Sequence, residues 1–210
     1  MPEAAAPIPA LDSDSAIPYA RSVVVLSPRD WDAIRRTVAT LFHVAHREAF
    51  QCRADAEPDA GPVARHRPPY HAVLMGYDFH LGLDGPRLIE INTNAGGALL
   101  NGAYTAEICS AAAAAGRCTD VLPVQTLRER LLATFLAELA AARPGARLGR
   151  VAIADDRPET QFLRGEFELF RQLFTEAGAE AVVCDVADLE RAPGGGLRVR
   201  GSRAPLDLVY

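Results

Sequence analysis

The sequence predicts a mixed α/β protein in which helices and an antiparallel β-hairpin precede a parallel β–α–β unit. Three observations lead to this fold class. Apolar and polar residues alternate over 75–81 and 87–92, on either side of a glycine-containing turn. Apolar residues recur at helical spacing from Pro28 to about Phe50 and from Leu127 to Ala142. After Pro144-Gly145 the pattern changes to strand, helix, strand.

The composition favours a protein that binds small molecules. The 210 residues are 49% hydrophobic and 23% charged, which is enough for a buried core. The net charge is −5 and the 22 basic residues are scattered, so neither nucleic acid nor an anionic membrane is an expected partner. All of the basic residues are Arg, and no apolar run approaches the roughly 20 residues of a membrane span.

The cysteines and the start of the chain predict a cytoplasmic location. The four cysteines have irregular spacing and no C-x-x-C motif, so neither a zinc site nor a disulfide framework is expected, and we expect reduced thiols. Residues 1–18 contain four prolines but neither a basic segment nor an apolar one. They therefore predict a disordered tail rather than a signal peptide.

The first elements follow this tail. Val23–Leu26 predicts a short strand, and Ser27 and Pro28 provide a helix cap and a proline at the first helical position. The helix should continue to about Phe50, and the polar segment Arg53–Pro69 predicts a mobile loop. The expected buried face of the helix comprises Trp31, Ile34, Val38, Leu41, Phe42 and Ala45.

Beyond the hairpin, the predicted elements divide at Pro144-Gly145, which we expect to be a domain boundary. Before it, helices are predicted over Ala98–Ala115 and Leu127–Ala142. After it, the strand Arg150–Ala154, the helix Glu159–Ala177 and the strand Ala181–Cys184 form the β–α–β unit.

Gly194-Gly195-Gly196 precedes no predicted helix, so it is interpreted as a turn rather than a phosphate loop. We expect it to open a hairpin made of Leu197–Arg200 and Leu206–Tyr210.

The register of the first hairpin brings two acids together. If its turn is centred near Asp84, residues whose numbers add up to 168 face one another, so Asp78 lies opposite Glu90 and Gly76 opposite Asn92. One face then carries Gly76, Asp78, His80, Leu88, Glu90 and Asn92. The inward face carries Met75, Tyr77, Phe79 and Leu81 against Ile89 and Ile91.

Two facing carboxylates destabilise a sheet unless a proton, an arginine or a divalent cation neutralises them. Carboxylate and amide oxygens on rigid strands suit Mg²⁺, and Gly76 would leave open space opposite Asn92. A solvated face whose acids never meet is the alternative, because a one-residue slip in register would separate them. From the residues alone both interpretations stay open.

The segment from Asp78 to Leu88-Ile89-Glu90-Ile91-Asn92-Thr93 resembles the metal-binding hairpin of ATP-grasp ligases. Its position before a β–α–β unit resembles circularly permuted members, namely eukaryotic-type glutathione synthetases and their glutathionylspermidine synthetase relatives. The similarity covers roughly Val23–Tyr210, and Asp78–Asn92 is its specific part. It implies that 19–144 is the N-terminal part of a permuted ATP-grasp catalytic domain and that 145–210 begins a parallel α/β substrate-binding domain.

The resemblance implies an ATP-dependent carboxylate–amine ligase that works through an acyl phosphate. Glu90 and Asn92 would bind Mg²⁺ or Mn²⁺, Asp78 would be a further ligand or a neighbouring acid, and ATP would be the cosubstrate. The implied partners are a small-molecule carboxylate and an amine, and the resemblance also allows a homodimer. A noncatalytic small-molecule-binding module with the same fold is the alternative.

The expected substrate-binding residues are Gly76, Asn94, Ala95, Gly96, Gly97, Asp156 and Arg157. Glutathione synthetases have an Arg and two Ser at the places of Gly76, Ala95 and Gly97, so an amino acid or peptide other than γ-Glu-Cys is expected. The Asn94–Gly97 loop offers N–H groups to an oxyanion, or it is simply a hinge. Asp156 and Arg157 follow a strand at the end where open sheets bind ligands, or they form a surface turn.

Some parts of an ATP-grasp enzyme are missing from this sequence. It contains no Lys and no glycine-rich flap to hold nucleotide phosphates, and it ends within an apolar strand. We therefore expect the 210 residues to be the N-terminal part of a longer enzyme and to be inactive alone.

Overall fold

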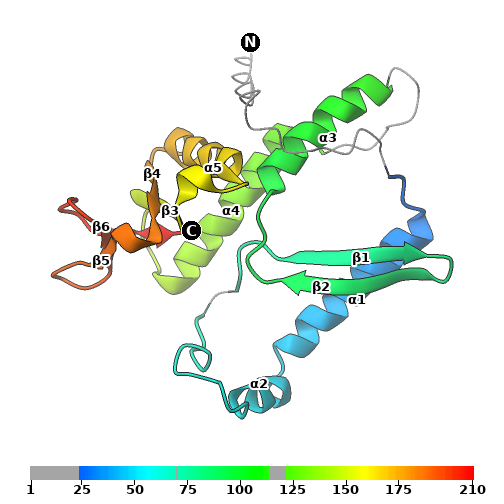
Figure 1. Ribbon diagram of the computed structural model, residues 1–210, viewed down its shortest axis with the longest axis horizontal. Coiled ribbons are helices and arrows are strands. Elements are labelled where there is room, and N and C mark those ends of the chain that lie inside the picture. Colours follow the sequence, from blue (N-terminus) through cyan, green and yellow to red (C-terminus); the bar gives the residue numbers. More distant parts are fainter. Residues whose placement is uncertain (1–23, 70, 114–121) are drawn as a thin grey trace. The chain divides into compact units, whose positions relative to one another are not determined.

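The computed structural model describes residues 24–69, 71–113 and 122–210, so the predicted tail 1–18 lies outside the described residues. The described chain has the predicted mixed α/β fold, with five α-helices, antiparallel hairpins and a three-stranded parallel sheet (Figure 1). It divides into two compact units, 24–95 and 96–210. In the described ranges no helix is both long and apolar enough to cross a membrane.

Unit 24–95 begins with helix α1, Pro28–Ala45. The predicted cap is confirmed, because the Ser27 hydroxyl oxygen accepts a hydrogen bond from the Asp30 backbone N–H at 3.1 Å. The helix was expected to reach Phe50, but it ends at Ala45 and a separate helix α2 covers Glu48–Asp55. At the break the His46 ring nitrogen Nδ1 lies 2.7 Å from the Phe42 carbonyl oxygen, which competes with the helical pattern.

Two further expectations for this unit were wrong. Residues 24–26 form no strand, and Val24 and Val25 are exposed because no neighbouring strand pairs with them. The loop expected over Arg53–Pro69 begins later than predicted, because 53–55 belong to α2, and the turns that follow are held by Arg67. The guanidinium of Arg67 donates to Asp55 Oδ1 at 2.7 Å and to the Ala64 carbonyl oxygen at 2.9 Å.

The hairpin of this unit comprises β1, Gly76–Gly82, and β2, Gly85–Asn92. Helix α1 packs against β2. Among the described residues of 24–95 no side chain is fully buried. This unit is therefore an amphipathic helix against a ribbon, without a closed core.

Unit 96–210 contains the parallel sheet, with strand order β4-β3-β7. Strands β3, Arg150–Asp155, and β4, Glu180–Asp185, pair in parallel through the crossover helix α5, Arg164–Glu176, which confirms the predicted β–α–β unit. A short 3₁₀ turn η1, Pro158–Thr160, precedes α5. Helices α3, Ala98–Ala113, and α4, Val124–Ala142, pack with α5.

The core of this unit is an aromatic cluster. Phe135 of α4 contacts Phe174 of α5 with ring centroids 5.0 Å apart, and Tyr210 lies edge-on to Phe170 at 4.7 Å. Phe135, Phe170 and Phe174 are almost completely inaccessible to solvent. Burial raises the pKa of the Tyr210 hydroxyl, and the neighbouring Glu166 adds to the shift.

The expected pairing of the last strands was wrong. β6, Leu197–Val199, pairs antiparallel with β5, Leu189–Arg191, and the triple glycine forms the turn between these strands. β7, Leu208–Val209, instead pairs in parallel with β3. The preceding Asp207 fixes it there, because its Oδ2 accepts hydrogen bonds from the backbone N–H groups of Gly149 at 3.0 Å and Arg150 at 2.8 Å.

Pro144-Gly145, the expected domain boundary, follows the end of α4 and lies inside unit 96–210. Gly145 has φ 81°, a backbone conformation that favours glycine after a helix.

The expectation of four reduced thiols was wrong for Cys109, which is disulfide-bonded. Cys52 and Cys184 are free thiols, and Cys118 lies outside the described residues. Stable disulfides are rare in the cytoplasm, so this bond does not support the predicted cytoplasmic location. That location stays a prediction.

The aromatic cluster should dominate the stability of unit 96–210. Phe135 is 1% exposed and contacts three other rings. The substitution Phe135→Ala should lower the free energy of unfolding by about 3–5 kcal/mol, because it leaves a cavity among those rings. Urea denaturation measures the effect. The matched control is Phe162→Ala, at a ring that is 64% exposed, and similar losses for the two variants would contradict the assigned core.

Candidate functional site

The predicted pairing of the two hairpin acids is confirmed. β1 and β2 are antiparallel, with Asp78 opposite Glu90 and Gly76 opposite Asn92. The two acids therefore come from rigid neighbouring strands and lie on the same face of the ribbon.

The turn itself differs from the prediction, and a β-bulge compensates for the difference. Gly82 pairs with Gly85 around Leu83-Asp84, so Phe79 faces Leu88 rather than Ile89. The register then shifts between Asp78 and Phe79, which leaves Ile89 as the extra residue of β2. Leu88 consequently shares the half-buried face with Phe79, and Ile89 is 64% exposed, so both were assigned to the wrong face.

The polar face of the hairpin is open to solvent at the predicted metal ligands. Asp78, Glu90 and Asn92 are all exposed, and the Asn92 Nδ2 donates to Glu90 Oε1 at 3.0 Å. The expected open space at Gly76 is absent, because a Cβ atom there would lie 3.2 Å from Ala95 Cβ and 3.5 Å from Asn92 Cβ. Gly76 is thus a point of close approach between β1 and the start of the following loop.

The donor set at this face fits a hard divalent cation that takes most of its ligands from outside the protein. Mg²⁺ binds through one or two carboxylates together with waters and substrate phosphates. Asp78 and Glu90 supply two carboxylates, and Asn92 beside Glu90 carries an amide whose Nδ2 contacts Glu90 Oε1. Within the described ranges no group of three or more His, Cys, Asp or Glu side chains is placed to hold a metal ion.

The N–H groups at the start of α3, directly after the predicted oxyanion loop, already hold a carboxylate of this chain. The backbone N–H groups of Leu99 and Leu100 donate to Glu166 Oε1 at 2.9 Å and Glu166 Oε2 at 2.8 Å. The Glu166 side chain belongs to α5 and is 1% exposed. In addition, the Ala95 N–H donates to the Leu74 carbonyl oxygen at 3.2 Å. Fewer N–H groups are therefore left for a ligand than the sequence predicted.

Burial raises the pKa of the Glu166 carboxyl, while hydrogen bonds from Leu99, Leu100, Ala98 and Gly97 partly oppose the rise. The sequence analysis did not single out Glu166. The available signal was its position on the apolar stripe of the helix, four residues before Phe170 and three before Leu169. An acid on a buried stripe requires a partner.

The Asn94–Gly97 loop also contacts the segment that precedes α5. A Cβ atom on Gly96 would lie 2.5 Å from Leu163 Cδ1, so the backbone at Gly96 passes directly over the Leu163 side chain. Gly97 has φ 88°, a conformation that favours glycine. Leu163, which follows Asp156 and Arg157 in the sequence, therefore contacts the loop at Gly96.

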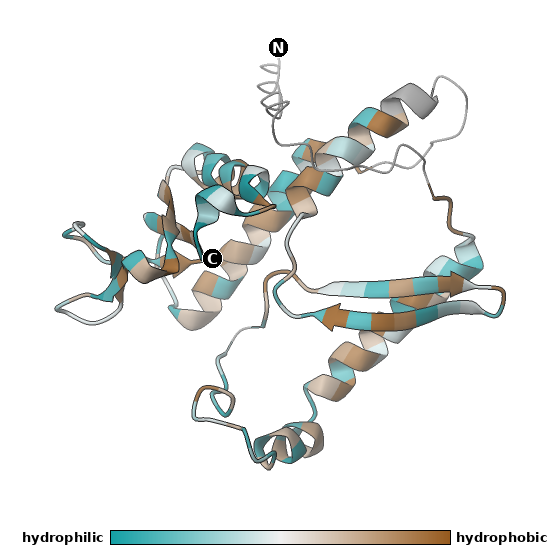
Figure 2. Cartoon of the chain, viewed as in Figure 1, coloured by the Kyte–Doolittle hydropathy of each residue, from teal (hydrophilic) through white to brown (hydrophobic). Residues whose placement is uncertain are grey.

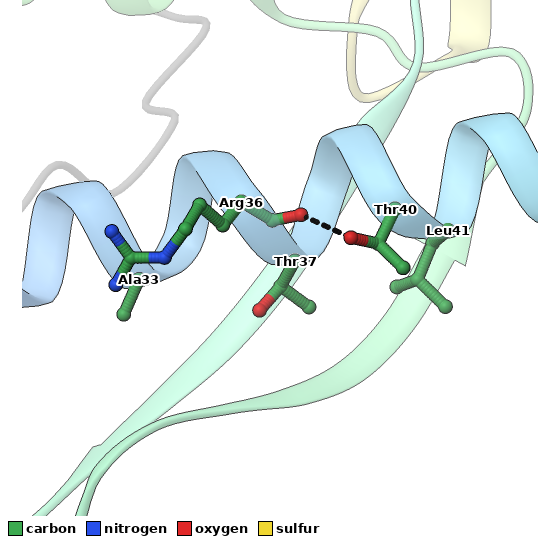
Figure 3. A pocket seen from close by; sticks show the side chains of 5 residues that line it. All are labelled: Ala33, Arg36, Thr37, Thr40 and Leu41. Atoms are coloured by element: carbon green, nitrogen blue, oxygen red, sulfur yellow. Dashed lines mark hydrogen bonds between the residues drawn. The ribbon is translucent and has the colours of Figure 1, made fainter.

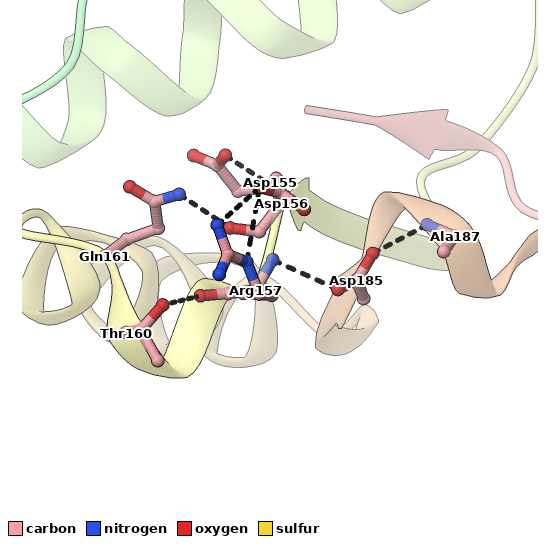
Figure 4. Close-up of polar contacts among 7 residues, drawn as sticks. All are labelled: Asp155, Asp156, Arg157, Thr160, Gln161, Asp185 and Ala187. Atoms are coloured by element: carbon pink, nitrogen blue, oxygen red, sulfur yellow. Dashed lines mark hydrogen bonds and ion pairs between the residues drawn. The ribbon is translucent and has the colours of Figure 1, made fainter.

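The two remaining predicted substrate residues form a turn at the carboxyl ends of β3 and β4 (Figure 4). Arg157 has φ 45°, and its N–H donates to Asp185 Oδ2 at 3.0 Å. Asp185 Oδ1 accepts a second hydrogen bond from the Ala187 N–H at 2.7 Å. The Gln161 Nε2 donates to the Asp156 carbonyl oxygen at 2.6 Å. Backbone contacts therefore fix the turn.

The side chains of this turn face solvent. The Arg157 guanidinium lies 3.3 Å from Asp156 Oδ2, and about seven-tenths of each side chain is exposed. An exposed ion pair of this kind contributes little to stability. Both side chains are accessible to a ligand, and a plain surface turn would have the same geometry.

A shallow depression on α1 was not predicted. It is lined by Ala33, Arg36, Thr37, Thr40 and Leu41 (Figure 3). The Thr40 hydroxyl donates to the Arg36 carbonyl oxygen of its own helix at 2.8 Å. Since its polar side chains do not converge on one point, the depression carries no recognisable chemistry.

Comparisons with known proteins found no matching family model, no matching curated protein and no matching solved structure.

Glu166→Gln should lower the free energy of unfolding by about 1–3 kcal/mol, because the amide offers one acceptor and turns N–H groups toward a backbone N–H. Urea denaturation near neutral pH measures the loss. Glu168→Gln on the same helix is the matched control, since Glu168 pairs with Arg171 at the surface. A loss at position 166 no larger than at position 168 would show that the buried contact is unimportant.

The stability provided by Asp185 should depend on pH. Hydrogen bonds from the backbone N–H groups of Ala187 and Arg157 lower the pKa of Asp185 below its ordinary value of 3.8. The folded protein then binds this proton less tightly than the unfolded chain does, so the stabilisation is present above pH 3.8 and is lost as the pH falls through the folded pKa.

The difference in unfolding free energy between the wild type and Asp185→Asn should accordingly shrink on acidification. Denaturant titrations from neutral to acidic pH measure it. A difference that stays constant over this range would contradict the assigned role of the Asp185 carboxylate.

Proposed function

We propose that this chain is part of an ATP-dependent carboxylate–amine ligase with an ATP-grasp-like fold. One observation carries the proposal: Asp78 and Glu90 lie directly opposite each other on the polar face of a hairpin, with Asn92 next to Glu90. These are the residues that match the ATP-grasp metal motif. The pairing of Asp78 with Glu90 across the hairpin is the main support for the proposal.

In this proposal Glu90 and Asn92 would hold Mg²⁺ or Mn²⁺, and Asp78 would be a third ligand or a neighbouring acid. A cation at this place would neutralise phosphate charge during transfer of the γ-phosphoryl group of ATP. The substrate carboxylate takes that phosphoryl group and becomes an acyl phosphate. An amine then attacks the acyl carbon, phosphate leaves, and the amine gives up a proton as the amide forms.

The substrate is a small carboxylate other than γ-Glu-Cys, such as an amino acid or a peptide. The close packing of Gly76 against Ala95 and Asn92 supports this choice, because an arginine at position 76 would have to displace Ala95. Without that arginine a charge-assisted contact to a substrate carboxylate is lost. Arg157 is the one basic residue among the predicted substrate residues, and its exposed guanidinium is accessible to a substrate carboxylate.

A noncatalytic small-molecule-binding module is the second candidate, and one observation favours it. The sequence contains no Lys, although Lys is a common binder of nucleotide phosphates. In such a module the turn at Asp156-Arg157 would bind a small ligand, and the hairpin acids would be solvated.

The test is ATP consumption by the natural protein expressed from its complete reading frame, screened over amino acids, small peptides and amines with Mg²⁺. Glu90→Ala should abolish turnover, because it removes a metal ligand from an exposed face where no packing depends on it. Circular dichroism should be unchanged and the unfolding temperature should not fall, because the substitution also removes the repulsion between Glu90 and Asp78. Coupled release of phosphate measures the rate.

Asp84→Ala is the control on the same hairpin. Asp84 is an exposed acid in the turn, and its surface contact is with Arg87, so its removal should leave turnover unchanged. Full activity in Glu90→Ala would remove the metal assignment. Binding of a carboxylate without ATP consumption for any pair would favour the noncatalytic module, and γ-Glu-Cys with glycine as the best pair would overturn the substrate assignment.

A further inference from the structure

The bulge in the first hairpin changes which side chains share the face of the two acids. In a regular ribbon that keeps the two acids opposite each other, His80 would face Leu88. Arg87 would then face Leu81, on the apolar side of the ribbon. In the structure, however, Arg87 faces His80. The bulge therefore turns a basic side chain onto the face that carries the acids, and β-bulges next to active sites commonly re-aim a side chain in this way.

This face of the hairpin has an acidic part and a basic part. Figure 2 shows hydrophilic and apolar residues interspersed along both strands. The pair of His80 and Arg87 adjoins the two acids on the side of the turn. Same-face neighbours along a strand lie about 7 Å apart, so the two pairs occupy adjoining positions on one surface. Over 76–92, Arg87 is the one residue that is Lys or Arg.

The guanidinium of Arg87 is accessible to a ligand. Its Nη2 lies 3.2 Å from Asp84 Oδ2 in the turn, and 72% of the Arg87 side chain is exposed. An exposed ion pair of this kind contributes little to stability. The Arg87 side chain can therefore leave Asp84 and turn toward the acids at little cost in free energy. Its planar fork of N–H donors matches two oxygens of a phosphate group.

A cation at the acids would create a need for a second positive group. Mg²⁺ bound by one or two carboxylates takes the rest of its ligands from waters and substrate phosphates. Two carboxylates already balance its charge, so a polyphosphate that binds to it brings negative charge that requires another partner. A guanidinium about 7 Å along the same face is such a partner. Lys, another common phosphate binder, is absent from the sequence.

We propose that Arg87 binds a phosphate group of a metal-bound polyphosphate, so that the hairpin face holds the cation at Asp78 and Glu90 and the phosphate chain at Arg87. The inference rests on the proposed function, because it requires the cation at the two acids. His80 faces Arg87 and offers a second N–H donor to the same phosphate group. The contact adds a residue of the hairpin to those that the metal motif singles out.

The test is equilibrium binding to the natural protein expressed from its complete reading frame. The probes are Mn²⁺ alone, Mn²⁺ with ATP and Mn²⁺ with inorganic tripolyphosphate, and electron paramagnetic resonance and titration calorimetry measure their dissociation constants. Arg87→Met should raise the constants of both polyphosphate complexes about tenfold, the size of one lost charge-assisted contact. It should bind Mn²⁺ alone at least as tightly as the wild type, because a positive charge beside the acids is removed.

Two further variants separate the fork of Arg87 from its charge. Arg87→Lys keeps the charge but loses the planar fork, so it should recover part of the lost affinity. Arg53→Met is the matched control, because Arg53 is an exposed arginine of α2 in the same unit. It makes the same change in net charge and should leave all three constants unchanged. Glu90→Ala should weaken the binding of all three probes, because it removes a proposed ligand of the cation.

The outcomes distinguish this inference from the proposed function. Unchanged polyphosphate affinity in Arg87→Met, in a protein where Glu90→Ala loses Mn²⁺, would overturn the inference and leave the proposed function standing. Equal losses in Arg87→Met and Arg53→Met would also overturn it, because net charge alone would then explain both. Wild-type affinity for Mn²⁺ in Glu90→Ala would instead contradict the proposed function, and the role of Arg87 would fail with it. A wild type that binds neither polyphosphate complex would overturn both.

Discussion

The buried carboxylate of Glu166 is the constraint on which the arrangement of unit 96–210 depends. Removing a charged group from water is costly unless hydrogen bonds replace its hydration. Here the N–H groups of Leu99 and Leu100 provide them at 2.9 and 2.8 Å, and the positive end of the α3 dipole adds to the attraction. The contact satisfies two N–H groups that a helix start leaves without a partner. One side chain therefore fixes the start of α3 against α5.

This contact determines where the predicted substrate residues of the unit lie. Helix α5 is the crossover between β3 and β4, so its position sets the strand ends that carry Asp156 and Arg157. Its start also lies against Gly96, where a Cβ atom would have to push the Leu163 side chain aside. The loop and the strand-end turn are consequently coupled through one short segment, and movement of α5 would shift both.

Local patterns in the sequence predicted the hairpin, the β–α–β unit and the pairing of Asp78 with Glu90, because alternation and helical spacing are local properties. The exchange of faces between Leu88 and Ile89 was not predictable, since a bulge changes the register without a distinct residue pattern. The place of β7 beside β3 depends on Asp207 and two backbone N–H groups more than fifty residues away. Glu166 was missed for a related reason, because its partners are distant backbone atoms.

The candidate metal ligands and the core of the protein are subject to different constraints. Unit 96–210 closes over an aromatic cluster, and its geometry follows from packing. The acids of the hairpin lie on an exposed ribbon, where no packing holds Asp78 and Glu90 against their mutual repulsion. A directly opposed pair of carboxylates costs stability in a ribbon that has little to spare. That cost has a physical reason if a cation binds at the two acids, because a cation would offset the repulsion between their carboxylates.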